Sequence, residues 1–288
     1  MSDARSLGFG DLVLCAGTVP LSSLQERVVA AAEAGFAGIS LFPHDYQRAR
    51  ASGLSDADLR GLLRDHDIRV AEIDPLLSWV PSDAAGAGVN EAGRAFLATG
   101  EDEFYAIADA LGARSINAAL ADPRPALLDA VADAFGALCD RAAAHGLLVT
   151  LEFLPWTTIR DAATAASVAI RAGRANGGVM LDAWHHFRSG AAIASIPAEH
   201  VFGIQLSDAP AAAEADPIDE TLHRRLAPGD GDIDLAGLLR LLAAGGCVAP
   251  VGIEVFSADW AGAPLSDTTQ RMADAARRIL AASRGSSS

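Results

Sequence analysis

The chain repeats one short pattern, in which an alanine-rich stretch ends at a glycine and a short apolar run follows. The pattern occurs around Gly35, Gly112, Gly146, Gly177 and Gly245. Glycine just beyond a helix adopts the left-handed conformation at little steric cost, so each alanine-rich stretch is predicted to be a helix that ends there. The apolar run after it has the length of a strand buried on both faces. Repeated units of this kind predict parallel strands joined by helices.

Eight candidate strands follow from this pattern. They are expected near Asp11–Ala16, Gly38–Phe42, Ile68–Ile73, Ser115–Ala118, Leu148–Glu152, Val179–Asp182, Val201–Leu206 and Val251–Val255. Helices are expected at Ser22–Ala34, Ser55–Asp65, Glu101–Leu111, Ala126–Ala144, Asp161–Ala172, Leu235–Ala244 and Thr268–Ala282, with a weakly marked one near His186–Ile193.

Eight strand–helix units in 288 residues predict an α/β protein with the (β/α)8, or TIM barrel, fold. We expect a single domain over residues 1–288, with 284–288 as a flexible tail. An open doubly wound sheet is the alternative. That fold usually has a glycine-rich phosphate turn after its first strand, and the CAGTVP segment at this point is not one.

Composition removes several kinds of function. All 22 basic residues are arginine, so a lysine Schiff base and a phosphate loop that ends in Gly-Lys are both excluded. The net charge of −15 opposes nucleic-acid binding, which depends on cationic contacts. Cys15, Cys139 and Cys247 lack metal-site spacing, so we expect buried reduced thiols in a cytoplasmic protein. No signal peptide or membrane span is recognisable.

Polar side chains stand at the ends of the last four predicted strands. Glu152, Asp182 and Glu254 each follow an apolar run, while Gln205 lies inside the seventh strand and Asp208 just beyond it. In a barrel, strand ends and the loops after them share one rim, where active sites are built, and two of these loops are long (74–100 and 207–233). Three carboxylates and an amide oxygen that converge would repel each other unless a cation lay between them. Each acid alone would also suit a helix cap or a solvated loop.

Other candidate residues follow from spacing and position. Asp182 and His185 form a D-x-x-H pattern, which makes His185 a candidate for proton transfer, although a packed histidine is the alternative. A pocket for a polyhydroxylated substrate needs hydrogen-bonding groups and an aromatic wall. Candidates at the same rim are His44, Asp45, Glu72, Asp74 and Asn117 for hydrogen bonding, and Trp79, Trp156, Trp184 and Phe256 for the wall.

These motifs resemble those of the xylose isomerase-like TIM barrels, specifically the sugar phosphate isomerase/epimerase group, over nearly the whole chain. The motifs are LEF, LDAWHH, IQLSDA, RRLAPGDGDID and GIEVF. The resemblance implies a divalent metal held by Glu152, Asp182, Gln205 and Glu254, with His185 and Arg225 in contact with substrate. The family usually has histidine at the seventh strand. Glutamine there is similar to what some 3-dehydroshikimate dehydratases of this superfamily carry.

The sequence therefore predicts a metal-dependent isomerase or epimerase that acts on a sugar, keto-sugar or cyclic polyol through an enediolate. A 3-dehydroshikimate-type dehydratase is the alternative on the same site. Oxygen ligands favour Mn²⁺ or Mg²⁺, with Co²⁺ or Zn²⁺ as alternatives. The predicted catalytic residues are Glu152, Glu254 and His185, and the predicted substrate-binding residues are Arg225, His44, Glu72, Trp184 and Asp208.

Two other classes of function were weighed. DNA endonucleases share this barrel superfamily, but they look histidine-rich and need a basic groove, whereas this chain has seven histidines and a net charge of −15. A non-catalytic barrel that binds a sugar or a partner would keep the same fold. We expect a small-molecule partner, no nucleic acid and no membrane, and the sequence leaves a homo-oligomer open.

Overall fold

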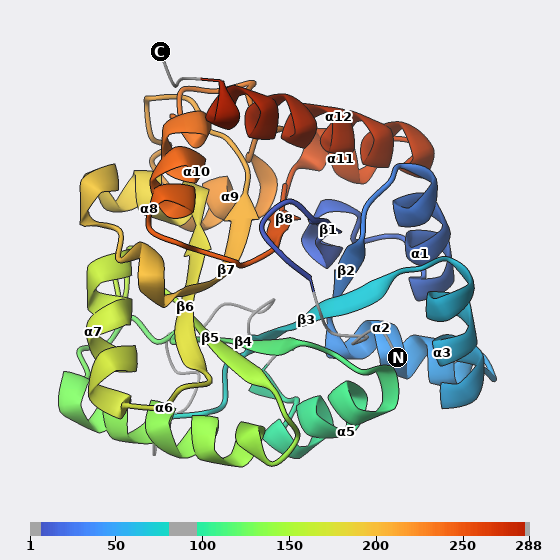
Figure 1. Ribbon diagram of the computed structural model, residues 1–288, viewed down its shortest axis with the longest axis horizontal. Coiled ribbons are helices and arrows are strands. Elements are labelled where there is room, and N and C mark those ends of the chain that lie inside the picture. The colour runs from blue at the N-terminus through green and yellow to red at the C-terminus, as the bar shows by residue number, and fades with distance from the viewer. Residues whose placement is uncertain (1–6, 81–96, 286–288) are drawn as a thin grey trace.

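The computed structural model describes residues 7–80 and 97–285 of the chain (Figure 1). Eight parallel strands form a closed barrel in which each strand pairs with the next and β8 pairs with β1. The predicted fold is therefore confirmed. The strands are β1 (Leu12–Leu14), β2 (Gly38–Leu41), β3 (Arg69–Leu76), β4 (Ser115–Ala119), β5 (Leu148–Glu152), β6 (Gly177–Asp182), β7 (Val201–Leu206) and β8 (Val251–Ile253).

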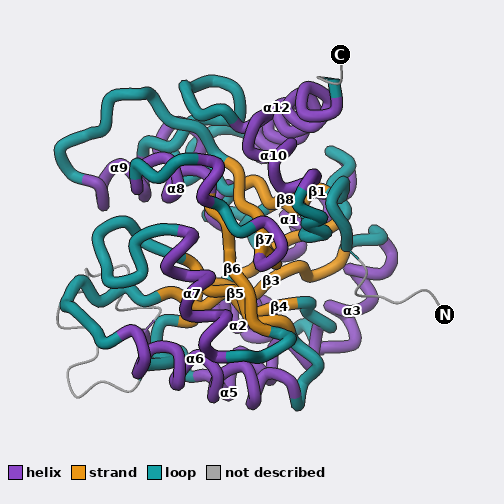
Figure 2. The backbone as a smooth tube through the Cα atoms, turned by 60° about the vertical axis from the view of Figure 1, so that its left-hand side comes forward, coloured by secondary structure: helices purple, strands orange, loops and turns teal. Residues whose placement is uncertain are grey.

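Helices surround the barrel, with the strands at the centre of the molecule (Figure 2). The α-helices are α1 (Leu24–Glu33), α2 (Pro43–Ala51), α3 (Asp56–Asp65), α5 (Glu101–Leu111), α6 (Leu128–Ala143), α7 (Ala162–Ala172), α8 (Ala183–Ser189), α9 (Pro217–His223), α10 (Leu235–Ala244), α11 (Ala258–Ala261) and α12 (Leu265–Arg284). Short 3-10 helices are η1 (Ala16–Thr18), η2 (Ile193–Ser195) and η3 (Ala198–His200). The sequence did not predict α2, α9 or α11, and α8 begins earlier than expected.

Local sequence explains where the helices begin and end. Ser23 caps α1 in a reciprocal pair with Glu26, which satisfies backbone N–H groups at the helix start. Gly112 ends α5 in the left-handed conformation, with φ of 72°. After α7 this role belongs to Gly173 rather than Gly177, which already lies in β6. After α10 it belongs to Gly246, with φ of 78°, rather than Gly245. The repeated pattern thus marks the helix ends, with the glycine displaced at these two units.

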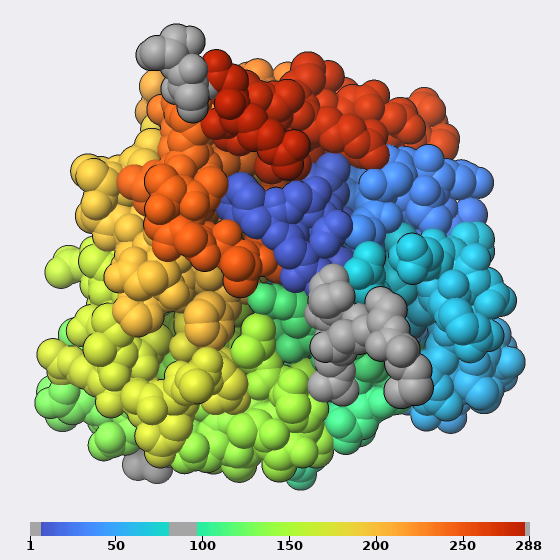
Figure 3. All heavy atoms as spheres, in the orientation of Figure 1, coloured from blue at the N-terminus to red at the C-terminus, as the bar shows by residue number. Residues whose placement is uncertain are grey.

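The N-terminal end of the barrel is closed by apolar side chains. Leu7 packs with Val13 and Ala71 in a small buried cluster of its own. Figure 3 shows the centre of this face covered by atoms of the N-terminal segment, in blue. The larger apolar core lies between the barrel and its helices. Access from solvent to the polar interior is therefore expected at the opposite, C-terminal end.

Three further features bear on the sequence predictions. Cys15, Cys139 and Cys247 are all buried free thiols, as expected. Helix α12 continues to Arg284, so the expected tail at 284–288 starts inside a helix, and residues 286–288 lie outside the described part. Among residues 7–80 and 97–285, no helix combines the length and apolar character needed to cross a membrane.

Candidate functional site

The polar residues predicted at consecutive strand ends lie at the C-terminal ends of four neighbouring strands. Glu152 ends β5, Asp182 ends β6, Gln205 is the penultimate residue of β7, and Glu254 directly follows β8. Asp182 pairs in register with Gln205 across β6 and β7. All four side chains are buried. The barrel therefore brings the four predicted metal ligands to one end of its interior.

A helix cap explains the D-x-x-H spacing. Asp182 ends β6 and is also the N-cap of α8, where its Oδ1 accepts a 2.8 Å hydrogen bond from the backbone N–H of His185. Such a cap satisfies a free N–H group at the helix start. Because α8 begins directly after the strand, His185 stays close to the strand ends. Its Nε2 lies 3.5 Å from Oε1 of Glu152.

Glu152, Asp182 and His185 form a cluster whose ligand-type atoms all lie within 4.8 Å of one another. Two nearby strand-end residues contribute further oxygen atoms. Oε1 of Glu254 and Oε1 of Gln205 are buried and have no hydrogen-bond partner among the residues that the structure describes. Carboxylate oxygen, amide oxygen and neutral imidazole nitrogen are ligands for divalent cations. The donor set therefore fits a divalent metal ion.

Arg225 lies in the middle of this cluster and is 2% exposed. Its Nη1 donates to Oδ2 of Asp182 at 2.7 Å and lies 3.8 Å from Oε2 of Glu254. Its Nε and Nη2 donate to the carbonyl oxygen and Oγ1 of Thr221 at 3.0 and 2.8 Å, and Nη2 is also 3.3 Å from Nε2 of His185. These contacts hold the guanidinium group rigidly inside the site. The predicted substrate contact of Arg225 stays a prediction.

Pairing between two loops places Arg225 at this point. The backbone N–H of Arg225 donates to the carbonyl oxygen of Phe256 at 3.0 Å, and Arg224 forms an antiparallel bridge with Ser257. The guanidinium carbon of Arg225 lies 5.2 Å from the ring centre of Trp184 and 5.3 Å from that of Phe256. A cation between two aromatic rings gains electrostatic attraction at both faces.

Five carboxyl groups are buried in and below the site, where Arg225 lies close to Asp182 and Glu254 and the partly buried Arg114 lies close to Glu72. Burial, reinforced by their neighbours' charges, raises the pKa of Glu72, Glu152 and Glu254 well above the ordinary value, and burial raises that of Asp74 to about 6. Burial acts in the same direction on Asp182, but Arg225 and His185 outweigh it and hold its pKa below the usual value. A divalent cation would offset this excess of negative charge.

The imidazole of His185 is neutral at neutral pH. Burial, with a contribution from Arg225, lowers its pKa to about 3 despite the opposing charge of Asp182. The ring packs edge-on against Trp156 and Trp184, with centroids 5.5 and 5.1 Å away. A neutral imidazole suits either coordination of a metal or acceptance of a proton.

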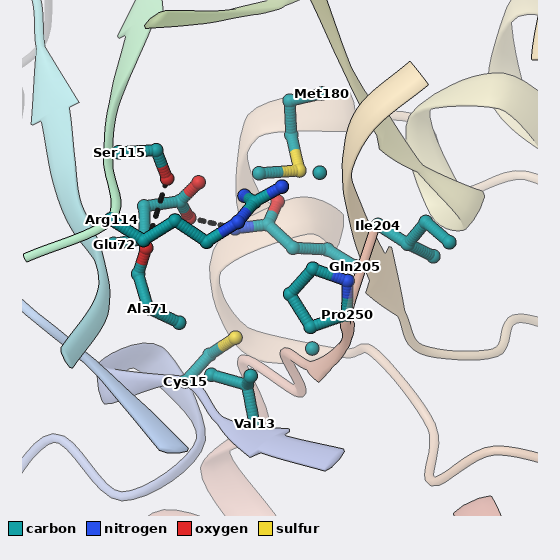
Figure 4. Close-up of a pocket in the computed structure, with 12 residues that line it drawn as sticks. Val13, Cys15, Ala71, Glu72, Arg114, Ser115, Met180, Ile204, Gln205 and Pro250 are labelled. Carbon is teal, nitrogen blue, oxygen red and sulfur yellow. Dashed lines mark hydrogen bonds between the residues drawn. The ribbon is translucent and has the colours of Figure 1, made fainter. Parts of the chain in front are cut away.

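An amide on β4 ties Glu152 to a second layer of polar groups. Asn117 donates from Nδ2 to Oε2 of Glu152 at 2.8 Å and to Oδ1 of Asp74 at 2.9 Å. Its Oδ1 accepts a 2.9 Å hydrogen bond from Thr150, whose hydroxyl is 3.4 Å from Oε2 of Glu72. Glu72 also accepts a 3.3 Å hydrogen bond from Gln205, and both side chains line a small pocket inside the barrel (Figure 4).

The remaining predicted substrate-binding residues are placed less directly for that role. Trp184 is fully buried, and both oxygens of Asp208 accept from backbone N–H groups of its own loop, at Ala209, Gly229 and Ile233. His44 is half-exposed at the start of α2, and Glu72 lies below the strand ends. The structure brings Trp184 against His185 and Arg225, and Glu72 against Gln205, and the substrate-binding roles of all four residues stay predictions.

The sequence prediction was incomplete for two contributors to the site. Asn117 was predicted only as a hydrogen-bonding candidate for the substrate pocket, whereas it donates hydrogen bonds to Asp74 and Glu152. Thr221 lies on α9, shortly before the RRLAPGDGDID motif, and fixes Arg225. Alternation along β4 could have indicated Asn117, because it faces the same interior as Glu152, whereas no sequence signal marks Thr221.

The raised carboxyl pKa values predict an unusual pH dependence for the metal-free protein. Glu72, Glu152 and Glu254 hold protons more tightly in the folded state than in the unfolded state. The free energy of unfolding therefore falls as pH rises through their folded pKa values. His185 acts in the opposite sense, but only below its unfolded pKa of about 6.5. We therefore expect the EDTA-treated protein to lose stability as the pH rises above about 6.5.

Urea unfolding at several pH values, with and without Mn²⁺, measures this effect. Bound metal keeps its ligands deprotonated, so the slope should flatten or reverse in the metal-loaded sample. A metal-free protein that becomes more stable across the same range would contradict the prediction.

Comparison with known proteins identifies the family of the chain. The xylose isomerase-like TIM barrel family matches residues 28–281, which is most of the chain. The chain belongs to this family. The resemblance predicted from the sequence is confirmed, and the fold is that of the family.

The curated relatives are longer than this member of the family. A 3-dehydroshikimate dehydratase of Pseudomonas aeruginosa is 33% identical over 277 residues, and one of Pseudomonas putida is 28% identical over the same length. In each case the match covers 91% of this chain and 40% of the relative. The chain thus spans about two fifths of the length of these relatives.

Solved structures share the fold at lower identity. A structure described as IolI protein with a bound zinc atom has a TM-score of 0.82 at 20% identity, and the match covers 94% of this chain and 98% of that one. A probable 3-dehydroshikimate dehydratase, AsbF of Bacillus anthracis, has a TM-score of 0.71 at 16% identity, with 93% and 98% covered. At these identities the structures support the fold of this xylose isomerase-like barrel alone.

Proposed function

We propose that this xylose isomerase-like barrel is a metal-dependent lyase that dehydrates 3-dehydroshikimate or a closely related cyclic hydroxy-ketone. The buried cluster of Glu152, Asp182 and His185, flanked by unpartnered oxygens of Gln205 and Glu254, carries the proposal. The curated relatives named 3-dehydroshikimate dehydratase support dehydration over the isomerase or epimerase activity that the sequence analysis favoured. The glutamine on β7 also supports dehydration, because it is similar to what some 3-dehydroshikimate dehydratases of the superfamily carry.

The metal ligands would be Glu152, Asp182, Gln205 and Glu254, with His185 beside them. Three carboxylates and one amide give an oxygen-rich set, which favours Mn²⁺ or Mg²⁺ over Co²⁺ or Zn²⁺. When bound, such an ion is a Lewis acid that stabilises negative charge on a ketone oxygen of the substrate. The pKa values of the four buried carboxyl groups other than Asp182 are raised. This is consistent with a site in which a cation is needed to stabilise their ionised forms.

Side chains of the protein would then transfer the protons. Dehydration breaks a C–H bond next to the ketone and a C–O bond one carbon further on, forms a carbon–carbon double bond and releases water. In this proposal His185 accepts the carbon-bound proton at Nε2 and returns it to the departing hydroxyl group. Arg225 keeps the ring in place from 3.3 Å away. Glu254, with its free Oε1, is the other candidate for proton transfer.

Incubation of the purified protein with Mn²⁺ and 3-dehydroshikimate tests the proposal. Loss of water and rearrangement of the ring give an aromatic dihydroxybenzoate, whose ultraviolet absorbance reports turnover. We expect a substitution His185→Asn to lower kcat by about 10²–10⁴-fold, the range typical of acid–base groups. EDTA-treated protein is the control. If the substrate stays unchanged while a keto-sugar is epimerised, the isomerase reading would replace this one.

A further inference from the structure

The contacts of Glu72 suggest that it acts on another side chain rather than on substrate. Its Oε1 accepts a 3.3 Å hydrogen bond from Nε2 of Gln205, across the barrel from β7 to β3. Figure 4 shows the Gln205 amide turned toward Glu72, with Met180 and Cys15 on either side. Glu72 is 5% exposed and Gln205 is 1% exposed. The pair is therefore a buried contact inside the barrel.

Packing restricts the stem of Gln205 as well. Gly252 lies opposite Gln205 in the β7–β8 register. A Cβ atom at Gly252 would lie 2.8 Å from the backbone oxygen of Ile204 and 2.9 Å from Sγ of Cys15, which is too close, and 3.5 Å from Cγ of Gln205, which is an ordinary contact distance. Gln205 is therefore buried against the β8 backbone, and a half-turn of its terminal amide changes which polar atom faces Glu72.

That half-turn decides whether Gln205 can bind a cation. An amide has an acceptor oxygen on one side and a donor NH₂ group on the other, and only the oxygen can coordinate a metal. Glu72 accepts the NH₂ group, which leaves Oε1 of Gln205 buried and without a partner among the described residues. The contact with Glu72 thus engages the NH₂ group of Gln205 and leaves its oxygen free.

We propose that Glu72 is a positioning residue that fixes the Gln205 amide with its oxygen available to the metal. This inference rests on the proposed metal site and adds to it the reason why glutamine works as a ligand on β7. Groups that orient metal ligands in this way typically contribute about 10–100-fold to metal affinity. The substrate contact predicted for Glu72 from the sequence is then unnecessary.

A double-mutant cycle with Mn²⁺ titration calorimetry tests the proposal without substrate. Glu72→Gln keeps the shape but can donate to the Gln205 oxygen, so we expect Mn²⁺ to bind about 10–100-fold more weakly. In a Gln205→Glu background the same substitution should leave affinity unchanged or improve it. A carboxylate ligand has two equivalent oxygens, and the new amide at position 72 can donate to it.

The different effect of Glu72→Gln on Mn²⁺ affinity in the two backgrounds distinguishes a positioning role of Glu72 from an effect of its charge. If the loss came only from removing a negative charge, Glu72→Gln would weaken binding in both backgrounds, and that result would overturn the proposal, as would no loss in either. The double variant Glu72→Gln with Gln205→Glu has the same composition and charge as the wild type, which makes it the matched control. Circular dichroism confirms folding, and Glu72→Met replaces Glu72→Gln in the wild-type comparison if the latter is insoluble.

Turnover at saturating Mn²⁺ gives a second readout. A positioning role predicts that Glu72→Gln recovers activity at high Mn²⁺ with an unchanged KM for substrate, whereas a raised KM would indicate a substrate contact and overturn the proposal. A wild-type protein that binds Mn²⁺ but does not dehydrate 3-dehydroshikimate refutes the proposed reaction and leaves the cycle valid. A wild type that binds no Mn²⁺ overturns both.

Discussion

Replacing Glu152 by glutamine is expected to remove most Mn²⁺ affinity and activity without destabilising the metal-free protein. Glu152 belongs to the tightest group of donor atoms in the site. The change should lower kcat by at least about 10²-fold, the lower end of the range for acid–base groups. The amide has nearly the same shape, and its oxygen can still accept the hydrogen bond that Asn117 gives to Oε2.

The metal-free variant is expected to match or exceed the wild type in stability. The reason is that burial and neighbouring charges penalise the ionised Glu152, as its raised pKa indicates. Thermal unfolding without Mn²⁺ measures the stability of the metal-free variant, and thermal unfolding with Mn²⁺ measures its loss of metal binding. Metal at about 100 times its Kd stabilises the wild type by about 2.7 kcal/mol, and this gain should vanish in the variant.

Glu199→Gln is the matched control, because Glu199 is an exposed glutamate far from the strand ends, in η3. It should keep the Mn²⁺-dependent stabilisation and the activity. A Glu152→Gln variant that binds Mn²⁺ as tightly as the wild type would remove Glu152 from the ligand set.

Replacing Arg225 by methionine is expected to destabilise the metal-free protein by about 3–5 kcal/mol, the usual cost of leaving one partner of a buried ion pair alone. Asp182 would lose the 2.7 Å hydrogen bond from Nη1, and Thr221 would lose the two hydrogen bonds that it accepts from Arg225. The structure also links this group to His185, so activity should fall with stability.

Mn²⁺ should restore part of the lost stability, because a divalent cation next to Asp182 replaces the missing positive charge. Urea unfolding with and without metal measures the difference. Arg224→Met is a close control. Arg224 is the preceding residue, but its side chain is exposed and pairs with Asp219 at the surface, where an ion pair contributes little. Equal effects of the two substitutions would contradict a central role for the buried guanidinium group.

The barrel was predictable because each unit carries its own local signals. Strands between glycine-ended helices were placed to within a few residues, and β5 and β7 match their predicted bounds. Helices α2 and α9 were missed because both begin with proline, Pro43 and Pro217, which is favoured at the first helical position but is usually read as a breaker. The predicted start of helix α8 lay too far along the chain because Asp182 both ends the strand and caps the helix.

The ends of consecutive strands were also predictable, since alternation along a strand decides which side chains face the barrel interior. Contacts between loops could not be predicted in this way. Arg225 is buried because its backbone pairs with Phe256, a contact between segments about 30 residues apart that no local pattern encodes. The depth of Glu72 depends on register irregularities on both sides of β3, which sequence periodicity cannot show.

The three buried thiols give the protein internal reporters of local opening. Cys15 follows β1 beside the Gln205 pocket, Cys139 lies in α6, and Cys247 precedes β8 and is 7% exposed. A thiol reagent can reach each one only when the surrounding structure opens, so the rate of modification reports that opening. Because the chain has no lysine, side reactions of the thiol reagent with lysine amino groups would not obscure the signal. Comparison of the three rates with and without Mn²⁺ would map how far the metal's stabilising effect extends through the barrel.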